Sequence, residues 1–86
     1  HATVELLCVN EAMNTVIDHF GTKIRTEQVD EDHFRFKAEV ALSPVFFAWV
    51  FQFGGMIEIA GPQEVKDAYR ERLRNQLDGA AGSKGV

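Results

Sequence analysis

The segment of residues 33–41, HFRFKAEVA, constrains the fold most, because apolar and polar side chains alternate along it. Successive side chains of a strand point to opposite faces of a sheet, so this pattern predicts a strand with one apolar face. The residues of that face are Phe34, Phe36, Ala38 and Val40. An apolar face needs a cover whereas a charged face can meet water, which is typical of an antiparallel sheet with helices on one side.

A weaker strand over residues 23–29 precedes this one, and Asp30-Glu31-Asp32 separates the two as a turn. We therefore predict a hairpin. A three-residue loop sets its register: Glu27 opposes Arg35, Lys23 opposes Glu39, and Arg25 opposes Lys37. The first two pairs attract, whereas the third places two like charges directly opposite each other, which is unfavourable.

The stretch SPVFFAWVFQFGG, residues 43–55, holds five of the nine aromatic side chains. Ser43 as a cap and Pro44 at the first position predict the start of a helix, and Gly54-Gly55 predict its end. The run is far shorter than the roughly 20 residues of a membrane span, so we expect no membrane segment. One stripe is spaced to face the sheet, and it comprises Phe46, Trp49, Val50 and Phe53. Phe47 and Phe51 point to a different side.

The other elements follow from the same two periodicities. A strand is expected over residues 3–9, with Val4, Leu6 and Cys8 pointing inward. Asn10 is expected to cap a helix that ends at Gly21. A fourth strand over residues 56–60 leads to a third helix that runs from Gly61-Pro62 to about Leu77. Its apolar stripe comprises Val65, Ala68, Tyr69, Leu73 and Leu77.

The first six elements run β-α-β-β-α-β, and a C-terminal helix follows. This order predicts an α+β fold, the ferredoxin-like sandwich, with a four-stranded antiparallel sheet and helices on one face. The fold class implies the strand order 4-1-3-2. Length predicts one domain over residues 1–78, and the small and polar residues 79–86 are expected to form a flexible tail.

The composition disfavours several functional classes. The net charge of −4 argues against general affinity for nucleic-acid backbones. Cys8 is the one cysteine, so no intrachain disulfide can form. His19 and His33 lack the spacing of metal ligands, and no nucleophile–base set or phosphate loop is visible. We therefore expect no enzyme activity, no metal, no cofactor and a cytoplasmic location.

A family resemblance rests on the second half of the chain. Phe46, Trp49, Val50 and Gly54, followed by IEIAGP and EVKDAYRERL, resemble the C-terminal extension, called WCX, of WYL-domain transcriptional regulators. The opening run VELLCVNEAMNTVIDHFG is also similar to the start of that module. The likeness covers roughly residues 4–73, and Trp49 before the glycine is its most informative part. Phe47 departs from the family, in which this position is more often polar.

The resemblance implies a ferredoxin-like module that follows a winged helix-turn-helix and a WYL domain and helps in dimerisation and effector binding. We thus expect a non-catalytic regulatory fragment of a longer protein. Its DNA contacts would come only from an absent N-terminal domain, and the absent WYL domain would lie against it. The alternative is an ACT-like domain that binds a small metabolite. ACT domains are also ferredoxin-like, and the sequence upstream would distinguish the two.

Two surfaces are the candidate sites. Lys23, Arg25, Arg35 and Lys37 form a cationic patch on the open sheet face. That patch is either a solvated face or a site for an anionic effector, such as a nucleotide or single-stranded nucleic acid. Phe47 and Phe51 are either covered by the third helix or form an interface with a second protomer of a homodimer or with a neighbouring domain.

Overall fold

The computed structural model describes the backbone of residues 1–82 and the side chains of residues 1–78. This part of the chain forms four strands and three α-helices, with one 3₁₀ turn after the first strand. In chain order they are β1 (Ala2–Val9), η1 (Asn10–Ala12), α1 (Met13–Phe20), β2 (Thr26–Gln28), β3 (His33–Val40), α2 (Pro44–Phe51), β4 (Ile57–Gly61) and α3 (Gln63–Gly82).

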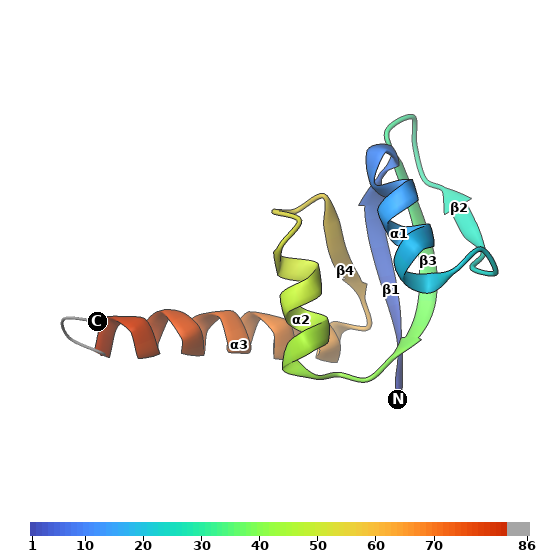
Figure 1. Cartoon of the computed structure of the whole chain (residues 1–86). Coiled ribbons are helices and arrows are strands. Elements are labelled where there is room, and N and C mark those ends of the chain that lie inside the picture. Colours follow the sequence, from blue (N-terminus) through green and yellow to red (C-terminus); the bar gives the residue numbers. More distant parts are fainter. Residues whose placement is uncertain (83–86) are drawn as a thin grey trace.

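The strands form a single antiparallel sheet in the order β2-β3-β1-β4. This is the predicted order, so the expected fold is confirmed as an α+β sandwich. Helices α1 and α2 lie on one face of the sheet, and α3 starts beside β4 and projects away from the other elements (Figure 1). Within residues 1–82 no helix lies on the opposite face of the sheet, which leaves the charged side of β3 open.

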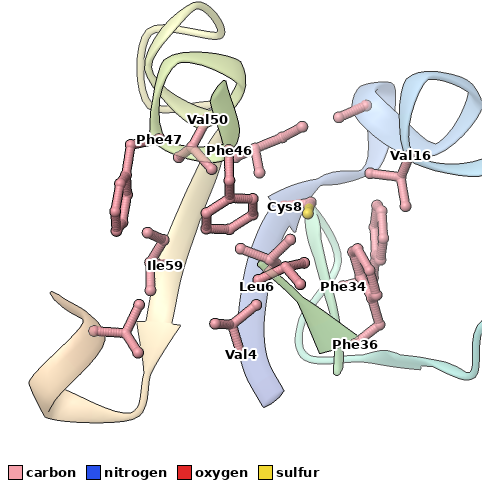
Figure 2. Close-up of a cluster of buried hydrophobic side chains, with 14 residues drawn as sticks. Val4, Leu6, Cys8, Val16, Phe34, Phe36, Phe46, Phe47, Val50 and Ile59 are labelled. Atoms are coloured by element: carbon pink, nitrogen blue, oxygen red, sulfur yellow. The ribbon is translucent and has the colours of Figure 1, made fainter. Parts of the chain in front are cut away.

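The core lies between the sheet and the helices α1 and α2. Val4, Leu6 and Cys8 of β1 are buried, as the alternation predicts, and Phe34 and Phe36 of β3 lie on the same side. The helices add their own apolar residues to this cluster, namely Ala12, Val16, Phe46, Phe47 and Val50 (Figure 2). Among the described residues no polar side chain is buried, so the core is held by apolar packing alone.

Helix α2 begins where the sequence predicts, but it ends at Phe51, before the predicted stop at Gly54-Gly55, so Phe53 lies outside the helix. The Ser43 hydroxyl accepts a hydrogen bond from the backbone N–H of Phe46 at 3.3 Å, and Pro44 occupies the first turn. This satisfies one of the N–H groups that a helix start leaves without a partner. After the helix, Gly54 and Gly55 adopt φ values of +59° and +94°, which other residues rarely reach.

The predicted role of Asn10 is wrong. Helix α1 has no side-chain cap. Instead, the Asn10 amide donates to the Glu31 carbonyl at 2.8 Å, and its oxygen accepts from Gln28 at 3.1 Å. Its backbone N–H donates to the Asp32 carbonyl. The tip of the β2–β3 hairpin lies against the end of β1. The Asn10 side chain therefore bonds the hairpin and does not cap α1.

The predicted first hairpin strand is too long. Strand β2 pairs with β3 only over Thr26–Gln28, in the predicted register, with Glu27 opposite Arg35. Residues 23–25 are not part of the strand. Continuing the register would place Arg25 against Lys37, and two like charges across a ladder are destabilising. The end of pairing at Thr26 agrees with this repulsion.

Helix α3 differs from the prediction in length and burial. It continues to Gly82, so the expected tail of residues 79–86 begins inside the helix, and residues 83–86 lie outside the described part. Val65 is buried, but Leu77, which was expected on the buried stripe, is 71% exposed. The helix has left the sheet by that point (Figure 1). Within residues 1–82 we find no helix with the length and apolarity that crossing a membrane requires.

Candidate functional site

A groove runs along the outer edge of β3, beside the residues that follow Phe36, which is the partner of Thr26 at the start of β2. Its volume is about 790 Å³, within the range of small-molecule sites. The charged side chains that line it are Glu5, Lys23, Arg25, Glu27, Arg35, Lys37 and Glu39. All four basic residues of the predicted patch therefore line one groove. The short β2 creates it, because residues 23–25 lie apart from β3 instead of pairing with it. We call this the edge groove.

The carboxylates in the edge groove change its electrostatics from those of a purely cationic patch. The Arg35 guanidinium bonds Glu27, with its Nε donating to the carboxylate at 2.7 Å. Lys37 lies opposite Glu5 across the β1–β3 ladder. Four cations thus face three carboxylates. The basic excess is small, and Arg35 is already engaged, so Lys23, Arg25 and Lys37 are the side chains that can hold an anion.

The floor of the edge groove is apolar. Phe20, Ile24, Phe36 and Ala38 line it from the helix side. Phe20 meets Phe36 edge-on, with ring centroids 5.3 Å apart, and it meets Trp49 in the same way at 5.4 Å. This aromatic packing holds the apolar side chains of the groove in place beside its charged residues.

Sequence reasoning missed Glu5 and the apolar floor. Glu5 is distant in sequence, and only the pairing of β1 with β3 brings it beside Lys37. Its outward position was visible from the alternation with Val4 and Leu6. The signal that could have found it is therefore the cross-strand register between these two strands.

The two candidate interface rings differ in burial. Phe47 is 5% exposed, which agrees with the alternative that the third helix covers it, whereas Phe51 is 61% exposed. Tyr69 of α3 stacks on the Phe47 ring at 5.6 Å, and the Arg72 guanidinium lies 5.1 Å from the ring centroid. In Figure 2 the neighbouring rings diverge: Phe46 points over the sheet toward Leu6, and Phe47 lies on the other side of α2, near Ile59.

Phe51 lines a second groove, between α2 and α3, of about 420 Å³. The lining residues repeat at helical spacing on both helices: Pro44, Phe47, Ala48 and Phe51 on α2, and Tyr69, Arg72, Leu73 and Gln76 on α3. An exposed aromatic ring beside such a groove is a candidate contact for a second surface. An interface role for Phe51 thus stays a prediction.

The tip of the hairpin holds a titratable pair. His33 Nδ1 lies 2.9 Å from an oxygen of Asp30, whose other contact is the backbone N–H of Asp32 at 2.8 Å. The hydrogen bond to Asp30 raises the pKa of His33 above its usual value. The same bond, and next the one from Asp32, lowers the pKa of Asp30. Both side chains are at the surface, so the pair stabilises the tip of the hairpin only modestly.

Cys8 and the histidines offer little chemistry. Burial raises the pKa of the Cys8 thiol to about 12, so the nucleophilic thiolate is scarce near neutral pH. The His19 ring stacks on Trp49 at 4.3 Å and takes part in the aromatic packing of the helices. Within the described residues, no three or more His, Cys, Asp or Glu side chains gather in a way that could hold a metal ion.

Comparison with known proteins identifies one family. The family model of the WCX domain matches residues 1–77, which is nearly the whole chain. The comparison with curated proteins found no match, and neither did the comparison with solved structures.

Proposed function

This chain belongs to the WCX domain family, which is associated with WYL-domain regulators, and we propose that it is the non-catalytic regulatory module of a cytoplasmic transcription regulator of that kind. The family match over residues 1–77 carries this proposal. Contact with DNA would come from a helix-turn-helix domain outside this chain. The net charge of −4 is consistent with DNA contacts that lie outside this chain.

We place effector sensing in the edge groove. The observation that supports this is the convergence of Lys23, Arg25 and Lys37 on one groove above an aromatic floor. An anion binds where positive side chains converge and can act together. The small cationic excess favours a compact anionic group, such as a phosphate, over a long nucleic-acid backbone, which needs many positive contacts.

We place dimerisation on the groove between α2 and α3, around Phe51. The support is the 61% exposure of this ring next to a groove whose walls are already aromatic. The test is sedimentation velocity on the chain and on Phe51→Glu. Val45→Glu is the matched control, because Val45 lies on the same helix and is 79% exposed but does not line this groove. We expect a dimer that Phe51→Glu alone dissociates. A monomeric wild type would overturn this assignment.

Effector sensing is tested with inorganic phosphate as the probe, in a titration at constant ionic strength. We expect Arg25→Ala combined with Lys37→Ala to weaken binding. The matched control is Lys66→Ala combined with Arg70→Ala, which removes the same charges from α3. We expect the control to bind phosphate as the wild type does. Equal weakening by both double variants would show that phosphate binding depends only on the net charge of the protein. The edge groove would then not be the effector site.

A further inference from the structure

The edge groove exists because β2 begins only at Thr26 and is therefore shorter than its partner β3. The pairs Thr26–Phe36, Glu27–Arg35 and Gln28–Phe34 define the β2–β3 ladder. On the β1 side, β3 is paired along its whole length, from His33 to Val40. On the β2 side the ladder ends at Thr26, so the part of β3 from Lys37 onward has an edge without a strand. Such an edge can accept a further strand.

Residues 23–25 are suited to be that strand in all but one position. Continuing the register places Ile24 opposite Ala38, on the covered face where both are half-buried. Lys23 would oppose Glu39, and opposite charges across a ladder attract. Arg25 alone would meet a like charge, Lys37. The repulsion between Arg25 and Lys37 is therefore the one unfavourable pair in a longer β2. A modest gain in the free energy of pairing could extend the strand.

We propose that a phosphate group bound between Arg25 and Lys37 draws residues 23–25 onto the edge of β3 and so lengthens β2. This inference rests on the proposed effector site and adds the ligand class and the structural response. A phosphate has several acceptor oxygens, so it can bond a guanidinium in bidentate fashion and an ammonium at the same time.

The carboxylates of the groove are compatible with this site. Glu27 is engaged by Arg35, and in the extended ladder Glu39 would face Lys23. Glu5, opposite Lys37, is the remaining carboxylate. Arg25 and Lys37 together carry one more charge than Glu5 balances, which leaves a net positive site between them. The ligand binds the extended form better because that form places Arg25 directly opposite Lys37, and such a difference in affinity shifts the population.

Amide hydrogen exchange of the chain, followed by NMR, tests the inference. Inorganic phosphate is added at constant ionic strength against chloride. We expect the amides of Lys23 and Arg25 to exchange more slowly, on the order of tenfold, because in the continued register these two residues form hydrogen-bonded pairs with β3. A nucleoside monophosphate forms a second arm. The same effect at a lower concentration would indicate a nucleotide as the source of the phosphate, and the same effect at an equal concentration would indicate the phosphate group alone.

The variant Arg25→Glu tests the extension of β2 independently of phosphate binding. A glutamate opposite Lys37 replaces repulsion by attraction, so we expect slow amide exchange at positions 23 and 25 without phosphate and no further slowing with it. Arg70→Glu on α3 is the matched charge reversal, and it should respond to phosphate as the wild type does.

Two results would overturn the inference in distinguishable ways. If phosphate shifts no resonance of Arg25 or Lys37, the groove binds no anion and the proposed effector site fails with it. If phosphate shifts those resonances but the amides at positions 23 and 25 exchange as before, and Arg25→Glu also leaves them unprotected, the anion site stands and the strand extension is wrong.

Discussion

The neighbouring rings of α2 give a controlled test of how α3 packs. Phe47 and Phe51 are one helical turn apart, and replacing either by alanine changes helix propensity equally. Their burial differs widely, at 5% and 61% exposed. If Tyr69 and Arg72 of α3 cover Phe47 as the structure shows, the two substitutions must have very different costs.

The magnitudes follow from burial. Phe47→Ala removes a ring that is almost fully covered, and such a change costs about 3–5 kcal/mol. Phe51 buries only about two-fifths of its surface, and since full burial contributes ~1.5–3 kcal/mol, its loss costs about 1 kcal/mol. For a domain of this size, each kcal/mol lowers the midpoint of thermal unfolding by roughly 4–8 °C. Phe47→Ala should therefore melt at least about 12 °C below the wild type.

Thermal unfolding followed by far-UV circular dichroism measures both variants against the wild type. The test is made at a protein concentration at which all three chains are monomeric, because association would add to the apparent stability. Equal melting temperatures for the two variants, or a larger loss for Phe51→Ala, would refute the packing of α3 on Phe47.

Three further outcomes can be measured on the same chain. Ser43→Ala should lower the free energy of unfolding by about 1 kcal/mol, since the cap on the Phe46 N–H is lost. Cys8 should resist a thiol reagent in the native state and react once denaturant exposes it, because its pKa is raised to about 12 by burial; rapid native labelling would contradict the burial. The pair of His33 and Asp30 should stabilise the fold only between the two pKa values. The contribution of His33 is present below its usual pKa of 6.5 and is lost as the pH rises through the raised pKa. That of Asp30 is present above 3.8 and is lost as the pH falls through the lowered pKa. His33→Gln should remove the decline with rising pH in a urea titration series, and an unchanged decline would show that other groups cause it.

Much of the fold could be predicted because its elements have local signals. The alternation from His33 to Val40 predicts the buried face of β3, and Ser43 marks the start of α2. The strand order followed from the element order and the rules of the fold class. These features depend on residues that are close in sequence.

The errors concern contacts between distant segments. Asn10 is a good helix cap by type, but the hairpin tip lies near enough to take its hydrogen bonds. The periodicity of α3 predicts a stripe that ends at Leu77, yet it cannot tell where the helix leaves the body of the domain. The same ignorance of the path of α3 left the burial of Phe47 undecided.

The candidate site was partly predictable. Arg35 and Lys37 follow from the alternation of β3, and the register with Glu27 was correct. That Lys23 and Arg25 line a groove rather than a strand could not be known, because a strand end depends on small differences between pairing energy and backbone entropy. The repulsive pair of Arg25 and Lys37 was visible in the register, and it was the one local indication that pairing would fail there.

An NMR titration of the isotope-labelled chain with inorganic phosphate, at constant ionic strength, tests the central claim most directly. If the edge groove is an anion site, the largest shifts should map to Lys23, Arg25 and Lys37, and they should saturate. Shifts that gather on the arginines of α3, or that spread evenly over all basic residues without saturation, would contradict a built effector site.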